Sequence, residues 1–310
     1  MNKKILITGA TGLIGRQIVN DLYGKGADIK IISTNKDNAK KLFQEQPDIE
    51  TFNWSEFNNP EKLSEIIEDV DVIINLSGAN VGDKRWTEKF KKEIYDSRVE
   101  TTTLIVNAVR MCDKKPECLI NASAVGIYGF RGDETLSEDS GLGNDFLAKL
   151  CIDWEAAALK VNNYGVRVVT MRSGIVLAKD DGALKKMITP FKFFIGGHQG
   201  SGRQWFSWIH IDDMVKLYIF ALENDNLSGP VNGTSPNPVT NDTLAKSIGK
   251  ILKRPAVFHV PGFALKIAVG EFAENLLSGQ KVYPAKAIEA GFKFKYPEIE
   301  EALEMCLGLS

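Results

Sequence analysis

Three glycines near the start of the chain have the spacing of a nucleotide-binding turn. The β-branched run Lys4–Thr8 leads into a Gly-x-x-Gly-x-x-Gly sequence, and a helical pattern follows it. In such a turn the first glycine permits the bend, the second lets the backbone approach a pyrophosphate, and the third lets helix and strand pack closely. No Gly-Lys-Ser/Thr sequence follows, which disfavours an ATP or GTP loop. We therefore expect dinucleotide contacts at Gly9, Thr11, Gly12, Leu13, Ile14 and Gly15.

The end of the second predicted strand indicates which dinucleotide binds. An NAD-selective site usually has an acidic residue here, which binds the ribose 2′-hydroxyl group. This chain instead has Ser33, Thr34, Asn35 and Lys36, and its first carboxylate is Asp37. A ribose 2′-phosphate would be repelled by an acid and accepted by these groups. The pattern favours NADP(H) over NAD(H), although an ordinary polar turn would look the same.

The first 180 residues alternate short apolar runs with helical patterns, which is typical of a parallel sheet covered on both faces. We predict an α/β protein with a Rossmann-type, doubly wound parallel sheet. The strand candidates are Lys4–Thr8, Ile29–Ser33, Val72–Leu76, Cys118–Ala122 and Arg167–Arg172. The helix candidates are Ile14–Lys25, Asn38–Gln44, Pro60–Ile67, Trp86–Cys112 and Phe146–Asn162.

The alternation ends after about residue 180. Gly196–Gly202 and Pro230–Asn241 have the composition of loops, whereas Leu265–Leu277 and Glu298–Leu307 have helical patterns. We expect residues 1–180 to form the NAD(P)-binding domain, with sheet elements returning around residues 205–235. Residues 181–310 would form a smaller C-terminal α/β lobe on the substrate side.

Composition narrows the choice of partners. The chain has 38 basic and 40 acidic residues, so its overall charge predicts neither a nucleic acid nor an anionic membrane as partner. A small-molecule substrate is expected, and a homodimer is compatible with the sequence. No apolar run is long enough for a signal core or a membrane span, and the few, scattered histidines predict no metal site. The four cysteines lack paired spacing and predict reduced, mostly buried thiols in a cytoplasmic protein: Cys112, Cys118, Cys151 and Cys306.

Four segments together resemble the extended short-chain dehydrogenases/reductases. These are Gly9–Gly15, Asn75–Ala79, Ser123–Gly129 and Trp208–Asp213. Within that superfamily the chain is similar to an atypical, epimerase-like branch whose members are sometimes labelled cell-division inhibitors. The segments that carry this closer resemblance are Ser77–Asn80, Arg85–Thr87, Ser97–Val99, Trp154–Glu155, Arg172–Leu177 and Gly279–Val282.

The resemblance implies further ligand contacts. Arg98 would lie on a helix that crosses the cofactor face, and Arg172 would end a buried strand, where an unpaired charge is costly. A pyrophosphate, a substrate anion or an internal carboxylate would each suit these arginines. The other expected cofactor contacts are Leu76, Ser77, Gly78, Ala122 and Gly174. The segment Gly196–Gln204 is expected to line the substrate entrance, with Arg203 and Gln204 as substrate contacts.

The catalytic pair of the superfamily is absent. Its ordinary members use a Tyr-x-x-x-Lys pair for proton transfer and ribose binding, but none of the seven tyrosines here is followed by lysine at the required spacing. Alignment on Glu155 places Leu147 and Cys151 in the two slots, and a one-residue slip places Phe146 and Leu150 there.

Two hydroxyl groups remain as catalytic candidates. Ser123 would bind the substrate or nicotinamide, or merely satisfy the backbone, and Tyr128 would supply a phenol or pack structurally.

Phe206 replaces the diphosphate-binding arginine of sugar-nucleotide epimerases, while His210 fits a structural corner. We expect an NADP(H)-binding epimerase-like or oxidoreductase-like protein with a small-molecule substrate. The alternative is a non-catalytic NADPH sensor or scaffold with a link to cell division.

Overall fold

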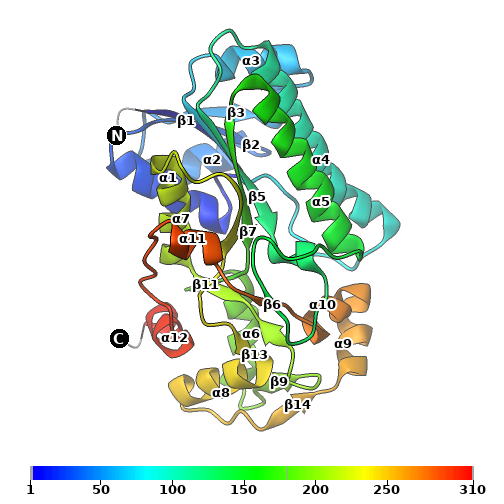
Figure 1. Cartoon of the computed structure of the whole chain (residues 1–310). Coiled ribbons are helices and arrows are strands. Elements are labelled where there is room, and N and C mark those ends of the chain that lie inside the picture. Colours follow the sequence, from blue (N-terminus) through cyan, green and yellow to red (C-terminus); the bar gives the residue numbers. More distant parts are fainter. Residues whose placement is uncertain (1–2, 180, 309–310) are drawn as a thin grey trace.

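The computed structural model describes residues 3–179 and 181–308. Its centre is a seven-stranded parallel sheet with the order β12-β7-β5-β4-β1-β2-β3 (Figure 1). The chain winds outward from β1 in both directions, which makes the neighbouring ends of β1 and β4 the switch point of the sheet. The predicted Rossmann-type fold is therefore confirmed. The strands are β1 (Lys4–Thr8), β2 (Asp28–Ser33), β3 (Glu50–Asn53), β4 (Val72–Asn75), β5 (Cys118–Ala124), β7 (Arg167–Ser173) and β12 (Gly229–Gly233).

Helices cover both faces of this sheet because its strands are apolar on both sides. Ile5 and Ile7 of β1 belong to one hydrophobic core, whereas Leu6 between them belongs to the other. The first face is covered by α1 (Leu13–Gly24), α2 (Lys36–Leu42) and α7 (Ile211–Glu223). The second is covered by α3 (Pro60–Ile67), α4 (Glu88–Met111) and α5 (Phe146–Leu159).

The second lobe is assembled from short elements around its own core, which includes Leu184, Trp208 and Leu303. Its strands pair as β8 with β11, β9 with β14, and β10 with β13, while β15 pairs with β6 of the first half. The elements are β6 (Thr135–Leu136), β8 (Ile175–Ala178), α6 (Gly182–Lys192), β9 (Gly197–Gln199), β10 (Trp205–Phe206), β11 (Trp208–His210), β13 (Val239–Thr240), α8 (Asn241–Leu252), β14 (Phe258–Val260), α9 (Gly262–Val269), α10 (Ala273–Leu277), β15 (Lys281–Val282), α11 (Ala285–Glu289) and α12 (Ile299–Leu307).

Three expectations for this half are wrong. The glycine-rich segment 196–202 contains β9, whose partner β14 lies about sixty residues further along the chain. The segment 230–241 contains most of β12 and all of β13. The helix expected over 265–277 is interrupted at Gly270, whose φ of +67° cannot continue a right-handed helix. In the first two segments the strands form by pairing with distant parts of the chain, and in the third a left-handed glycine ends the helix. The local composition indicates none of these.

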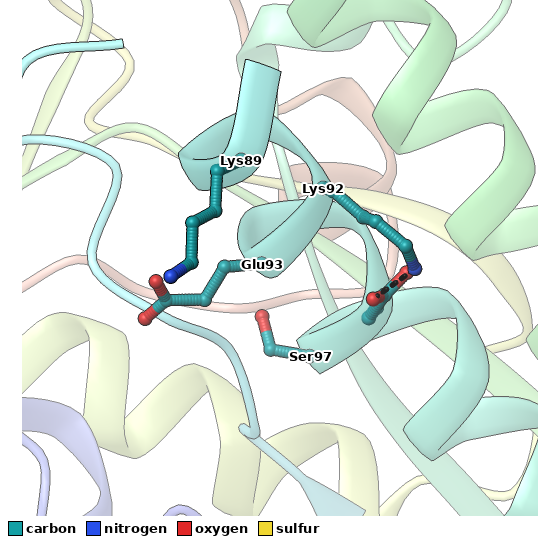
Figure 2. A pocket seen from close by; sticks show the side chains of 5 residues that line it. Lys89, Lys92, Glu93 and Ser97 are labelled. Atoms are coloured by element: carbon teal, nitrogen blue, oxygen red, sulfur yellow. Dashed lines mark hydrogen bonds and ion pairs between the residues drawn. The ribbon is translucent and has the colours of Figure 1, made fainter. Parts of the chain in front are cut away.

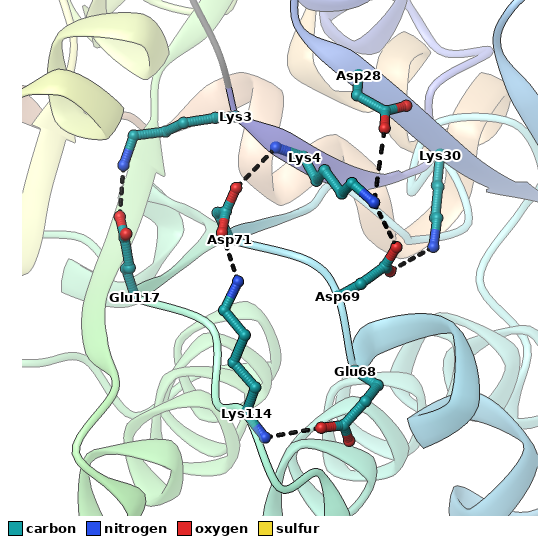
Figure 3. Close-up of polar contacts among 9 residues, drawn as sticks. All are labelled: Lys3, Lys4, Asp28, Lys30, Glu68, Asp69, Asp71, Lys114 and Glu117. Atoms are coloured by element: carbon teal, nitrogen blue, oxygen red, sulfur yellow. Dashed lines mark hydrogen bonds and ion pairs between the residues drawn. The ribbon is translucent and has the colours of Figure 1, made fainter.

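A network of charges joins the amino ends of the central strands (Figure 3). The Lys4 ammonium group lies 2.7 Å from one oxygen of Asp69, and the Lys30 ammonium group lies 2.5 Å from the other. Asp71 accepts hydrogen bonds from the backbone of Lys4 and the side chain of Lys114. Partial burial raises the pKa of Asp69, but the two lysines outweigh it and lower the pKa to about 2.

No helix within residues 3–179 and 181–308 is long and apolar enough to cross a membrane.

Candidate cofactor and active site

Buried polar side chains organise the carboxyl ends of β1, β4 and β5. The Thr8 hydroxyl group donates to Asn75 Oδ1 over 2.6 Å, and Ser77 Oγ donates to Thr8 Oγ1 over 2.8 Å. The Asn75 amide nitrogen donates to Thr102 Oγ1 and to Asn121 Oδ1, at 2.9 and 2.6 Å. All five side chains are buried, so breaking any bond would leave a costly unsatisfied group. This network fixes the loops that follow β1 and β4.

The glycine turn between β1 and α1 has the geometry expected of a phosphate cradle. Gly9 has a φ of +68°, and a Cβ atom on it would lie 2.6 Å from the carbonyl oxygen of Leu76. A Cβ atom on Gly15 would lie 2.5 Å from the carbonyl oxygen of Gly9. Gly12 is the N-cap of α1, so no side chain at this position caps the amide groups of the helix's first turn. These groups fit a pyrophosphate.

A second feature beside this turn is Arg98, which lies over the backbone of Gly78. A Cβ atom on Gly78 would lie 2.8 Å from Arg98 Cζ, and Ser97 Oγ holds the loop by accepting from the Ala79 amide at 3.0 Å. The guanidinium group donates to the Ile94 carbonyl oxygen and stacks 5.2 Å from the Trp154 ring centroid. No carboxylate within the described part of the chain pairs with Arg98. Burial lowers the pKa of Arg98, because removing the charged guanidinium group from water costs free energy. A bound anion would offset that desolvation cost.

The end of β2 presents a neutral polar surface. Ser33 is buried, and its hydroxyl oxygen accepts from the Asn35 amide at 3.1 Å. The Asn35 side-chain oxygen caps α2 by accepting from the Asn38 amide at 2.9 Å. Thr34 is exposed. This strand end carries no carboxylate. It leads directly into the capped N-terminus of α2, and Thr34 is exposed beside it.

Ser123 lies directly beside Arg172, because the two residues are paired across β5 and β7. Arg172 donates from Nε and Nη2 to the two carboxylate oxygens of Glu155, at 2.8 and 2.9 Å. The Ser123 hydroxyl group also donates to Glu155 Oε1, at 2.6 Å. Arg172 is therefore held by an internal ion pair, and its predicted contact with the cofactor stays a prediction. The other interpretation left open by the sequence, a salt bridge, is the one observed.

This arrangement determines what Ser123 can do. A carboxylate paired with arginine only accepts hydrogen bonds, so the Ser123 proton points to Glu155. The lone pairs of Ser123 are then left for a ligand, which must donate to them. An amide N–H group, such as that of a nicotinamide carboxamide, meets this requirement better than a carbonyl oxygen that needs polarising.

Tyr128 does not reach the cleft. Its side chain is fully buried, its hydroxyl group donates to Asn232 Oδ1 at 2.6 Å, and it accepts from Arg172 Nη1 at 2.9 Å. Burial raises its pKa, which further opposes a role in proton transfer. Of the two roles that the sequence left open for Tyr128, the structural one is observed, since Tyr128 belongs to the hydrogen-bond network around Arg172.

The two slots of the missing pair lie on α5. Leu147 packs against Gly126, where a Cβ atom would touch it at 3.4 Å. Cys151 is buried, and burial raises its pKa to about 12, so its thiol stays protonated. In the shifted alignment, Phe146 and Leu150 are also apolar. Neither alignment supplies an acid or base at these positions.

The remaining predicted contacts are distributed between loop and lobe. Ala122 is partly buried in β5, whereas Arg203 is exposed. Gln204 donates to the carbonyl oxygens of Gln199 and Leu276, and so joins two loops of the second lobe. A Cβ atom on Gly174 would lie 2.7 Å from the Ser207 carbonyl oxygen, which explains why glycine is needed where β7 passes into β8. Gly174 therefore has a packing role in this structure.

Phe206 and His210 belong to the framework of the second lobe. Phe206 is buried in that lobe's core. His210 Nδ1 accepts from the Asp212 amide at 3.1 Å and caps α7, and its ring packs 4.2 Å from that of Tyr296. Burial lowers the pKa of His210. The expected structural corner is confirmed.

An open hollow of about 450 Å³ runs along the first turns of α4 (Figure 2). Lys89, Glu93 and Ser97 line it at intervals of one helical turn, and Lys92 pairs with Asp96 at its edge. Its lining contains equal numbers of cations and carboxylates. It therefore has no net preference for an anion, in contrast to the surroundings of Arg98.

Several functional residues were not singled out from sequence. Glu155 was used there in a family segment and as an alignment mark, although it orients Ser123, and neither Asn75 nor Asn121 was given a role of its own. Their common signal is a polar residue inside or beside an apolar run, which is costly unless a partner is buried with it. Among residues 3–179 and 181–308, no group of three His, Cys, Asp or Glu side chains is placed to hold a metal ion.

The parallel sheet, the glycine turn and the cation beside it define a nucleotide-binding α/β protein of the extended dehydrogenase/reductase type. The family model described as the NAD dependent epimerase/dehydratase family matches residues 5–232, and a domain of unknown function matches residues 260–306. The chain belongs to the NAD dependent epimerase/dehydratase family, and within it to the epimerase family proteins related to SDR39U1.

Two relatives show how far the likeness extends. The chloroplastic SDR39U1 homolog of Arabidopsis thaliana is 41% identical over 303 residues, which cover 96% of this chain and 85% of the relative. The epimerase family protein YfhF of Bacillus subtilis is 39% identical, with 98% of each chain covered. The similarity therefore includes both lobes.

Solved structures agree with the fold. Human SDR39U1, whose structure was determined with NADPH, is 31% identical and superposes with a TM-score of 0.86 over 98% of this chain and 99% of that one. A UDP-glucuronic acid 4-epimerase from Bacillus cereus, in complex with UDP-glucuronic acid and NAD, has a TM-score of 0.78 over 97% of this chain and 96% of that one, at 17% identity. At that identity the second likeness shows the fold alone.

Proposed function

We propose that this protein binds NADP(H) and uses it in an epimerase-like or oxidoreductase reaction on a small molecule that is not a sugar nucleotide. The observation that carries the proposal is the pairing of an uncapped helix N-terminus at Gly12 with the unpaired guanidinium group of Arg98. Both features stabilise a pyrophosphate. The SDR39U1 structure with NADPH supports the choice of dinucleotide.

The preference for the phosphorylated cofactor rests on the end of β2. The hydroxyl groups of Ser33 and Thr34 and the amide of Asn35 stand where an NAD-selective site would have a carboxylate. Lys36 lies next to them, although its ammonium group is 3.0 Å from Glu56. A 2′-phosphate would compete with Glu56 for this lysine.

At the other end of the cofactor, Ser123 would orient the nicotinamide by accepting from its carboxamide. When bound, NADPH would supply a hydride. The described residues near Ser123 offer no phenol or ammonium group to deliver the accompanying proton, since Tyr128 is buried and Leu147 and Cys151 are inert. We therefore assign that proton to solvent or to an acidic group of the substrate itself.

Sugar nucleotides fit this site poorly. In the ordinary epimerases that the sequence resembles, a diphosphate-binding arginine precedes the histidine of the second lobe by four residues. Here Phe206 occupies that position and is packed in the lobe's core. A neutral carbonyl compound or its alcohol needs no such cation and is the substrate class we favour.

The second candidate is a non-catalytic NADPH sensor or scaffold, and the missing Tyr-x-x-x-Lys pair favours it. Against it, a buried ion pair between Arg172 and Glu155 orients the Ser123 hydroxyl group, which argues for chemistry at that position. The four free, buried thiols suit a reducing compartment, and we place the protein in the cytoplasm.

The test begins with fluorescence titrations of NADPH and NADH, followed by NADPH absorbance with aldehydes, ketones and UDP-glucose as substrates. We expect tighter binding of NADPH, oxidation with a neutral carbonyl compound, and none with UDP-glucose. Tighter NADH binding would overturn the cofactor preference. NADPH binding without oxidation by any carbonyl compound would favour the sensor, and no binding of either cofactor would reject both functions.

A further inference from the structure

A narrow crevice separates the nucleotide-binding half from the second lobe. One wall is the start of α5, with Phe146 and Leu147, together with Trp86 from the loop before α4. The opposite wall is formed by Glu271 and by Asn275 of α10. In Figure 1 the crevice lies where α10 meets the lower end of α5. Sites for small ligands are often formed between two lobes in this way.

The crevice adjoins the position of the missing catalytic pair. The tyrosine slot falls on Leu147 in one alignment and on Phe146 in the other, and both residues line the crevice. In the ordinary members that the sequence resembles, the phenol at that slot exchanges a proton with the substrate. The slot therefore marks where a reacting oxygen atom would lie, and the crevice is open space beside it.

Apolar side chains form much of the crevice surface. The Trp86 ring packs edge to face against Phe146, with centroids 5.1 Å apart, and it also contacts Phe272 at 5.5 Å. Phe130 and Leu147 add further apolar surface. The indole nitrogen of Trp86 is not a free donor, because it bonds a backbone carbonyl oxygen of its own loop at 2.9 Å. A ligand in the crevice would therefore be held mainly by apolar contacts.

The charges along the crevice are carboxylates. Asp145, Glu271 and Glu274 line it, whereas no Lys, Arg or His belongs to its described lining. Asp145 caps α5, and Glu271 lies 2.7 Å from the Lys91 ammonium group, so neither carboxylate needs a cationic ligand. All three would repel an anionic ligand. Asn275 adds a neutral amide, which can donate to a carbonyl oxygen.

The volume of the crevice limits the size of its ligand. It encloses about 50 Å³. One water molecule needs about 10–15 Å³ of such space, so the crevice accommodates about four water-sized groups. A pocket for a drug-sized ligand has roughly 300 Å³ or more. The crevice therefore suits a compound of about four to six heavy atoms, which is much smaller than a sugar nucleotide.

We propose that this crevice binds a short, neutral, largely apolar carbonyl compound, which is the substrate of the protein. The inference rests on the proposed function and adds the position, size and charge of the substrate. In the reduction, the carbonyl carbon accepts the hydride of NADPH, the carbonyl oxygen takes a proton from solvent, and the products are an alcohol and NADP⁺. A short neutral carbonyl compound has no acidic group of its own, which leaves solvent as the source of that proton.

The first test compares isobutyramide, a neutral amide that hydride transfer does not reduce, with isobutyrate, its anionic isostere. Saturation-transfer NMR measures their binding to the full-length protein with and without NADPH. We expect isobutyramide to bind and isobutyrate to bind at least about tenfold more weakly, because of the carboxylates. Equal affinities, tighter binding of isobutyrate, or no binding of isobutyramide would overturn the proposal.

Two variants fill the crevice from opposite walls. Leu147→Trp extends from α5 and Asn275→Trp from α10, and each should weaken isobutyramide binding about tenfold or more, because the added ring takes the space of the ligand. Leu42→Trp is the control, since it adds the same side chain at a 41% exposed position of α2 and should leave binding unchanged. Thermal unfolding and NADPH affinity check that each variant is folded. Unchanged binding in both crevice variants would overturn the proposal.

A third variant tests the charge of the crevice. Glu274→Gln should reduce the preference for isobutyramide over isobutyrate about two- to fivefold, because one exposed charge is removed. Glu301→Gln, in the exposed first turn of α12, is the matched control and should leave that preference unchanged. An equal change in both variants would show that total charge sets the preference, which would contradict the proposal.

Turnover separates this inference from the proposed function. With NADPH, the kcat/KM for butane-2,3-dione should be at least about tenfold above that for pyruvate, an anion of similar size. Preferred reduction of pyruvate would overturn the inference and still leave an oxidoreductase. Isobutyramide binding without oxidation of NADPH by any carbonyl compound would reject the proposed reaction, whereas it would support binding in the crevice.

Discussion

Glu155 and Ser123 are joined by a buried 2.6 Å hydrogen bond between the helix that usually carries the catalytic pair and the strand end beneath it. Arg172 neutralises the carboxylate from the other side through two further bonds. Because the Ser123 proton points to Glu155, Ser123 can only accept a hydrogen bond from a ligand in the cleft. The orientation of Ser123 therefore depends on the same ion pair that stabilises the core.

Replacement of Glu155 by glutamine should therefore lower the free energy of unfolding by about 3–5 kcal/mol, since Arg172 is left as an unpaired buried charge. Ser123→Ala should cost only about 1 kcal/mol, because the ion pair remains. Urea unfolding measures both. Similar costs for the two variants would show that the ion pair is not what holds this region together.

Arg98→Met should weaken NADPH binding about 10- to 150-fold, the range for a charge-assisted hydrogen bond. The protein without cofactor should become no less stable, since the variant removes an unpaired, partly buried charge. Calorimetric titration and thermal unfolding test the two parts. Arg110→Met is the matched control, because Arg110 lies exposed in the last turn of the same helix. Loss of affinity in the control, or a destabilised Arg98 variant, would contradict this assignment.

Gly9→Ala should both destabilise the protein by about 2 kcal/mol or more and abolish cofactor binding. A left-handed φ costs alanine about 1–2 kcal/mol, and its Cβ atom would also collide with the Leu76 carbonyl group. Gly24→Ala serves for comparison, because a Cβ atom there meets nothing within 4 Å. That variant should be stabilised by up to about 1 kcal/mol and bind NADPH normally. Tolerance of alanine at residue 9 would refute the described turn.

Asp69→Asn should reduce stability above about pH 4, where the native carboxylate is charged and paired with Lys4 and Lys30. The folded pKa of about 2 is below the ordinary 3.8, so this contribution is lost as the pH falls through that interval. Asp69 is partly exposed, which limits the difference to about 1 kcal/mol or less. Urea unfolding between pH 2 and 6 checks the trend, with the exposed Asp139→Asn as control. A difference that grows towards low pH would have the wrong sign.

The first half of the fold could be predicted because its signals are local. The run Lys4–Thr8 and the three glycines after it are contiguous, and β1 has those bounds in the structure. Which charged side chains pair and which are buried at the strand ends could not be predicted, because both depend on the tertiary structure. The partner of Arg172 comes from α5, and its position depends on how that helix packs against β7, which no spacing in the sequence reveals.

Tyr128 is a second residue whose contacts could not be predicted from the local sequence. Its place in a turn after a strand end left open whether the phenol is accessible or packed, and the structure shows it buried, with its hydrogen bond accepted by Asn232, 104 residues later in the chain. The glycine-rich composition of residues 196–202 likewise gave no sign of a strand, because β9 is defined by its pairing with β14 and by little else.

The position of β12 has a consequence for synthesis of the protein. This edge strand contains Asn232, and it pairs with β7 only after the chain has passed through β8 to β11 and α7. A nascent chain on the ribosome therefore cannot complete its nucleotide-binding sheet, or satisfy the Tyr128 hydroxyl group, until much of the other lobe has emerged. A fragment ending at residue 180 would lack that edge, so the site and both lobes must mature together.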